Sequence, residues 1–161
     1  MNQAHFHLLI NHIPILFPIV GILLIVGALV FKSAAVKQAA LAVFVCGALA
    51  TFPAMYTGEG AEDVVENLPG VTEQIIETHE ETAETFAFMS YALGVISLLG
   101  LWAGWQQKRF APVLSYAILA FSLVVVFFAS RTGLSGGEIR HTEIRTDAPL
   151  APTDVAASDE D

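Results

Sequence analysis

Charged side chains are scarce in this chain, and that scarcity excludes an ordinary soluble domain. Only 14% of the 161 residues are Asp, Glu, Lys or Arg, whereas 55% are hydrophobic. The few charges leave long uncharged stretches, and each can hold the roughly 20 apolar residues with which a helix crosses about 30 Å of hydrocarbon. We therefore expect four membrane-spanning segments, at about residues 8–31, 37–57, 85–105 and 111–130.

Cysteine is almost absent, since Cys46 is the only one. A single cysteine excludes an intrachain disulfide, and the chain has no Cys-x-x-Cys-His motif for covalent haem attachment. It also has no glycine-rich phosphate loop and no serine nucleophile elbow, so a hydrolase is not expected. The opening residues, Met1 to Ala4, lack the positive region of a secretory signal, and we expect the first span to be retained.

The spans are expected to be α-helices. In lipid every backbone N–H and C=O group must be bonded within its own segment, and no stretch alternates as a barrel strand would. Small residues recur along the spans and allow helices to approach closely. These features predict an all-α fold in which residues 1–146 form an integral membrane antiparallel four-helix bundle. Residues 147–161 are expected to form a disordered acidic tail.

The charges are distributed unevenly between the links, and this predicts the orientation. The two short links carry Lys32, Lys37, Lys108 and Arg109 with no acid among them, which marks the cytoplasmic side. All Asp and Glu residues fall on the opposite side, so both termini are expected to face outward. This arrangement suits a bacterial inner membrane, with lipid around the bundle and the acidic segments in the periplasm.

The outward segments contain two glycine-rich stretches. Residues 56–61 predict a turn, after which a helix is expected to begin near Thr72 and to continue into the third span as an outer-face helical loop. Residues 130–141 predict a return over the mouth of the bundle. Near the N-terminus, Pro14 and Pro18 predict a kink or a late helix start at the outer surface.

This topology places all five histidines at the outer face. They are His5, His7, His12, His79 and His141. A neutral imidazole nitrogen can bind haem iron, and a haem in a helix bundle needs two such ligands from facing helices. We expect His12 and His79 to be the axial ligands, because they lie near the surface on different spans and His79 shares an apolar helix face with Ile75 and Ile76.

Further residues could complete a haem site. His7 is turned about 140° from His12 on a helix, so the first helix could also address a second haem, held by His7 and His141. The only cations expected on the outer side could bind haem propionates, and they are Arg131, Arg140 and Arg145. His5 is terminal and is the weakest of the histidine candidates.

Two alternatives remain open for these residues. A metal site could combine histidine with Glu59, Glu77 or Glu80 to bind copper, iron or zinc. Alternatively, the chain could be a structural subunit of a larger respiratory complex, with histidines at an interface and an acidic exterior that docks a basic partner. No carboxylate lies within a predicted span, so a proton pump is not expected. Nucleic acid is not expected as a partner.

Four short motifs resemble an uncharacterised family of small four-span bacterial membrane proteins. They are His-Phe-His-Leu-Leu-Ile-Asn-His-Ile-Pro-Ile-Leu at residues 5–16, Thr-Gly-Glu-Gly-Ala at 57–61, His-Glu at 79–80 and Gly-Gly-Glu-Ile-Arg-His at 136–141. Related domains of unknown function are joined to c-type cytochrome or Rieske iron–sulfur modules. The resemblance extends to about residue 145, although the relatives often begin with a His-Pro pair where this chain has His12-Ile13-Pro14.

The resemblance implies respiratory electron transfer at the periplasmic face, and it carries over four histidines, His7, His12, His79 and His141. The resulting hypothesis is a membrane protein that binds one or two non-covalent b-type haems. It would carry electrons between the quinone pool and a periplasmic redox protein, as an electron-transfer subunit of an oxidoreductase. A quinone could bind in the kinked entrance near Asn11.

Overall fold

The computed structural model describes residues 2–145, and this part of the chain is helical without any strand. The predicted all-α class is confirmed. The helices are α1 (Gln3–Ile10), α2 (His12–Val30), α3 (Ala34–Val65), α4 (Glu73–Trp105) and α5 (Ala111–Arg140), followed by one 3-10 turn, η1 (Thr142–Ile144). The predicted acidic tail, residues 147–161, lies outside the described residues.

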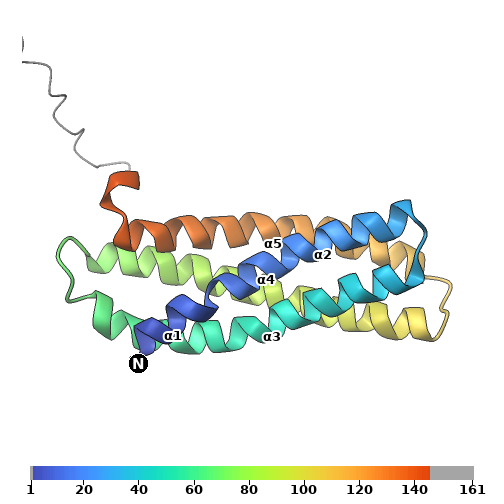
Figure 1. The fold of residues 1–161 in the computed structure, drawn as a ribbon, viewed down its shortest axis with the longest axis horizontal. Helices are drawn as coiled ribbons and strands as arrows, with labels where there is room; N and C mark the ends of the chain where they lie inside the picture. The colour runs from blue at the N-terminus through green and yellow to red at the C-terminus, as the bar shows by residue number, and fades with distance from the viewer. Residues whose placement is uncertain (1, 146–161) are drawn as a thin grey trace, which may run out of the picture.

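The four long helices run side by side as an up-and-down bundle (Figure 1). Each packs on its neighbour in the chain, and α2 also packs on α5, which closes the bundle, while α1 lies against α3. The α2–α3 and α4–α5 links lie together at one end, which we call the lysine end because it carries Lys32 and Lys108. The other end, the histidine end, carries α1, the α3–α4 connection and η1.

α1 and α2 follow one another as a single long helical segment that is interrupted at Asn11. The backbone N–H of Asn11 still donates to the His7 carbonyl, so the chain bends without leaving the bundle. Pro14 stands in the first turn of α2, where a missing N–H costs no helical hydrogen bond. The helix already begins at Gln3, so the predicted late start does not occur, and the break at Asn11 stands where the kink near the two prolines was predicted.

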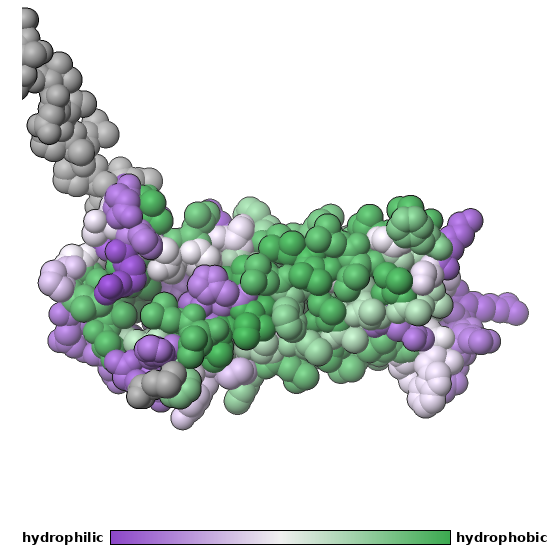
Figure 2. All heavy atoms as spheres, in the orientation of Figure 1, coloured by the Kyte–Doolittle hydropathy of each residue, from purple (hydrophilic) through white to green (hydrophobic). Residues whose placement is uncertain are grey.

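Four helical rods are long and apolar enough to cross a membrane. Figure 2 shows a broad hydrophobic band around the middle of the bundle, with hydrophilic residues at both ends. The 33 residues of α4 extend over about 50 Å, which exceeds a hydrocarbon core of about 30 Å. Part of the bundle therefore projects beyond the apolar layer, and the acidic stretches Glu59–Val65 and Glu73–Glu84 place this projection at the histidine end.

Two predictions about loops are wrong. The expected turn at residues 56–61 is helical, since α3 continues to Val65, and the expected return at residues 130–141 is the last part of α5. The glycines in these stretches serve close packing. A Cβ atom at Gly60 would lie 2.6 Å from Gln3 Cγ, and one at Gly136 would lie 2.9 Å from His79 Cε1. The helix expected near Thr72 is confirmed, with Thr72 preceding its first residue.

The centre of the bundle combines a small apolar core with paired hydroxyl groups. The largest fully buried apolar side chains are Ile25, Leu41, Phe44, Leu93, Ile118 and Val125. Thr51 on α3 and Ser90 on α4 lie 2.9 Å apart between their oxygens, and Thr51 also donates to the Gly47 carbonyl. Buried hydroxyls of this kind satisfy one another, and they connect α3 to α4.

Close helix packing predicts opposite effects for two glycine substitutions on α4. A Cβ atom at Gly94 would lie 2.5 Å from Ala48 Cβ, which is not at the end of a flexible chain, whereas one at Gly104 would meet nothing within 4 Å. We expect Gly94→Ala to destabilise the bundle by about 1–3 kcal/mol through overpacking. Gly104→Ala, the matched control, should be neutral or stabilising because alanine favours helix. Thermal unfolding in detergent measures both, and equal midpoints would contradict this packing.

Candidate functional site

His7 is held against α3 through one ring nitrogen. Its Nδ1 lies 3.0 Å from the Ala54 carbonyl oxygen and 3.3 Å from Thr57 Oγ1. A carbonyl oxygen only accepts, so Nδ1 carries the proton and donates it, which leaves Nε2 with a free lone pair in the neutral ring. Gly58 lies beside the ring, where a Cβ would come within van der Waals contact of His7 Cε1, at 3.4 Å.

His79 is held in a similar way by α5. Its Nδ1 lies 3.0 Å from Ser135 Oγ, and Ser135 in turn donates to the Thr132 carbonyl at 3.1 Å. When Ser135 gives its proton to that carbonyl it accepts from His79, and in this arrangement Nδ1 carries the proton and Nε2 keeps a lone pair. Thr82 Oγ1 lies 2.8 Å from the same Ser135 oxygen, and Thr132 Oγ1 donates to the Thr82 carbonyl at 2.9 Å. This network joins α4 to α5.

The structure places His7 on α1 and His79 on α4 at the same end of the bundle. Both rings are partly buried. They are close enough that a positive charge on His7 would act on His79. Two imidazoles from different helices, each fixed through Nδ1, therefore lie near one another at the histidine end.

The other histidines lie at the surface. His5, His12 and His141 are exposed. His12 is close enough to act electrostatically on His7, whereas His141 Nδ1 pairs with Glu143 Oε1 at 2.8 Å. The pKa of the Glu143 carboxyl is lowered, first by a hydrogen bond from its own backbone N–H and then by the bond from His141. The expected pairs, His12 with His79 and His7 with His141, differ from the pair that the fold places inside.

The three outer arginines have different surroundings. Arg131 and Arg140 are exposed, and Arg131 borders a hollow of about 280 Å³ with Thr82 and Phe128. The guanidinium of Arg145 donates to the carbonyls of Glu138 at 2.8 Å, Ile139 at 3.2 Å and Gly70 at 2.7 Å. Arg145 therefore ties the end of α5 to the α3–α4 connection, while Arg131 and Arg140 keep their side chains at the surface.

Carboxylates gather between α3 and α4. Glu80 on α4 lies close enough to Glu62 on α3 for the two carboxylates to repel each other, and Glu84 and Glu59 add to this repulsion. Even so, no group of three or more His, Cys, Asp or Glu residues in residues 2–145 is arranged to hold a metal ion. Glu77, the third acid named for a metal site, is exposed on α4.

A buried polar atom near His7 has no partner. The side-chain oxygen of Asn11, at the break between α1 and α2, is inaccessible to solvent and unpaired in the structure. An unpaired buried amide oxygen is costly, and such groups are concentrated where a ligand or an unseen water binds. Asn11 lies four residues after His7, so this atom belongs to the same end of the bundle.

Several site residues had no signal in the sequence. Thr57, Ser135, Gly58 and Gly136 look like loop residues by composition, yet they hold or accommodate the two imidazoles. Their roles depend on which helix faces each ring. A serine or glycine three to four residues from another small residue is the only hint, and it applies equally to many transmembrane positions.

No protein-family model, curated protein or solved structure matches this chain.

The hydrogen bond to Ala54 predicts the tautomer of His7. Above the ordinary histidine pKa, the neutral His7 ring should carry its proton on Nδ1, because the Ala54 carbonyl can only accept. ¹⁵N-histidine NMR distinguishes the tautomers by their nitrogen shifts, and exposed His5 serves as the control within the same sample. An unprotonated Nδ1 at His7 would refute this geometry.

Proposed function

We propose that the histidine end binds a non-covalent b-type haem, with His7 and His79 as its axial ligands. The observation that carries this proposal is the matched geometry of the two rings. Each is partly buried, each lies on a different helix, and each is fixed through Nδ1 with Nε2 left free. Metal-binding histidines usually donate their second ring nitrogen to a carbonyl or another acceptor in this way, which sets the tautomer and the ring orientation.

The donor set fits haem better than it fits the alternative of a copper, iron or zinc site. Haem supplies four nitrogen ligands itself and needs only two from the protein, whereas a His/Glu metal site needs three or four. In the described part of the chain, no such larger set is present. Arg131 and Arg140 are the exposed cations nearest this end, and they would offset the propionate charges.

The proposed activity is electron transfer in a bacterial inner membrane, with the histidine end in the periplasm. Lys32, Lys37, Lys108 and Arg109 at the other end support this orientation through the positive-inside rule. Haem would supply a one-electron couple, and the chain would set its potential through ligand identity, burial and nearby charge. The quinone pool and a periplasmic redox protein, alone or within a respiratory complex, are the proposed partners. The resemblance to the four-span family agrees with this role and stays a prediction.

A visible spectrum tests the haem proposal. Protein expressed with haem supplementation and purified in mild detergent should show a b-type reduced-minus-oxidised spectrum and a pyridine haemochrome. His7→Ala and His79→Ala should each lose the six-coordinate, bis-histidine spectrum of this pigment, because each removes one of the two proposed axial ligands. His5→Ala is the matched control and should keep it, since His5 is exposed on the same helix as His7.

The same variants separate the alternative ligand pairs. Loss of pigment in His12→Ala or His141→Ala, with His7→Ala unaffected, would return the assignment to the pairs expected from sequence. A colourless wild-type protein would overturn the haem proposal, and elemental analysis for copper, iron and zinc would then test the metal alternative.

Ser135 predicts a graded effect on the same site. Its oxygen orients His79, so Ser135→Ala should lower haem affinity by about 10–100-fold while the protein stays folded. Ser130→Ala is the control, because Ser130 lies on α5 and bonds only to the Phe127 carbonyl of its own helix. Titration of apoprotein with haem measures both affinities. Equal affinities for the two variants would show that Ser135 does not position the ligand.

A further inference from the structure

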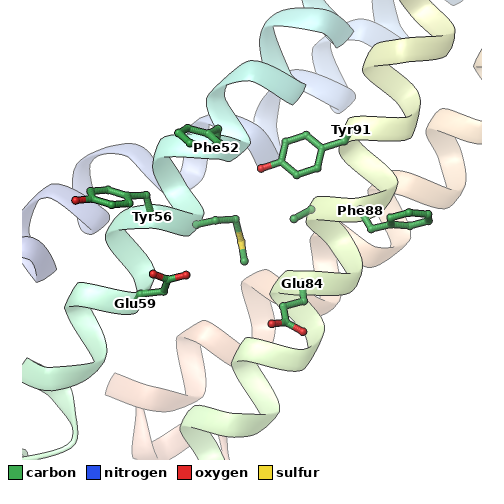
Figure 3. A pocket seen from close by; sticks show the side chains of 8 residues that line it. Phe52, Tyr56, Glu59, Glu84, Phe88 and Tyr91 are labelled. Atoms are coloured by element: carbon green, nitrogen blue, oxygen red, sulfur yellow. The ribbon is translucent and has the colours of Figure 1, made fainter.

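A groove opens between α3 and α4, with α2 and α5 behind it (Figure 3). Its volume is about 430 Å³, and four of its eight lining residues are aromatic, while two are carboxylates. Phe52, Tyr56 and Phe88 are 69%, 64% and 68% exposed. In a bundle that crosses a membrane, this exposure faces lipid, so a ligand would enter the groove sideways from the membrane.

The two ends of the groove differ in chemistry. Figure 3 shows Glu59 on α3 and Glu84 on α4 at one end, with Phe52 and Tyr91 toward the other. The carboxylate end belongs to the projecting histidine end, and the aromatic end lies at the depth of the apolar band. A fitting ligand therefore has an apolar tail and a polar head. Ionised carboxylates only accept hydrogen bonds, so that head must supply donors.

The positions of the two carboxylates indicate which polar head group fits the groove. Glu59 and Glu84 approach from opposite sides of the groove, so a flat ring with a hydroxyl at each edge can donate to both. Figure 3 shows the Tyr91 ring between the two helices, whereas the Tyr56 and Phe88 rings lie on their outer sides. Tyr91 is therefore the aromatic side chain that a ring in the groove can contact. A para-hydroquinone has these features. Its oxidised form, a quinone, carries only acceptors, which the carboxylates would disfavour.

We propose that this groove binds the hydroquinone head of an isoprenoid quinol, with Glu59 and Glu84 accepting hydrogen bonds from its two hydroxyl groups. The inference rests on the proposed function, because it names the reduced quinone as the partner of the haem site and gives its location. It also replaces the entrance near Asn11 as the candidate position for a quinone.

The groove adjoins the His7 site through α3. Met55 and Tyr56 line the groove, while Ala54 and Thr57 on the same turns hold the His7 ring. A ligand in the groove and the imidazole of His7 would thus flank one helix, which is about 10 Å across with its side chains. An electron donor to a haem held by His7 and His79 would have to lie this close.

Photolabelling tests the groove without depending on haem. The full chain in phosphatidylcholine nanodiscs is labelled with an azido-substituted ubiquinol, and the labelled peptides are mapped by mass spectrometry. We expect labelling within residues 52–59 and 84–91, with decylubiquinol competing about tenfold better than decylubiquinone. The Glu59→Gln/Glu84→Gln variant should lose about tenfold in apparent affinity, because its amides still accept hydrogen bonds but lack charge. Glu73→Gln/Glu77→Gln removes the same charge from positions on α4 that do not line the groove, and should leave labelling unchanged.

Each other outcome overturns the proposal. Labelling elsewhere would show that quinol binds another site. Equal competition by decylubiquinol and decylubiquinone would show that Glu59 and Glu84 do not recognise the hydroxyl groups of the quinol. If dodecyltrimethylammonium displaced the label better than decylubiquinol, the groove would be a site for cationic amphiphiles. The visible spectrum tests the haem proposal and photolabelling tests the groove proposal, so the two results are independent. A colourless protein labelled in the groove would contradict the haem proposal alone, and a pigmented protein without groove labelling would contradict only this one.

Discussion

Polar atoms that are removed from water must find their partners inside the protein, and this constraint determines most of the structure. Each backbone group in the apolar band is satisfied by its own helix. Buried hydroxyls follow the same rule: Ser115 donates to the carbonyl four residues earlier, and Thr51 pairs with Ser90 across two helices. In His7 and His79, the Nδ1 atom alone has a hydrogen-bond partner among residues 2–145. One ring nitrogen on each is therefore committed to structure, and the other remains available for chemistry.

Close approach of the helices makes these pairings possible. Gly58 and Gly136 stand where a side chain would meet His7 and His79, and Gly94 brings α4 against Ala48. Between helices in lipid the hydrophobic effect gives little driving force, so dispersion contacts and short hydrogen bonds must hold the bundle. The same small residues that pack the helices thus create the space in which the rings sit.

Charge divides the molecule along its length. The lysine end carries only cations in its links, and the histidine end carries all the carboxylates of the described residues. The acids between α3 and α4 have no lysine or arginine partner among residues 2–145, where the one side-chain contact between an acid and a basic residue joins Glu143 to His141. An acidic end of this kind would attract a basic protein, and this electrostatic steering would not require a specific groove.

The sequence by itself determined the number of spans, their helical state and the presence of every histidine at one end, because uncharged length and link charge are local properties. It placed the helix start near Thr72 and the break before Pro14 for the same reason. It misjudged residues 56–61 and 130–141, where glycine signals a turn in water but permits helix packing in a bundle. Only the tertiary structure decided that His7, rather than His12, accompanies His79 inside, since Ala54, Thr57 and Ser135 become neighbours of these rings only when α1 lies on α3 and α4 lies on α5.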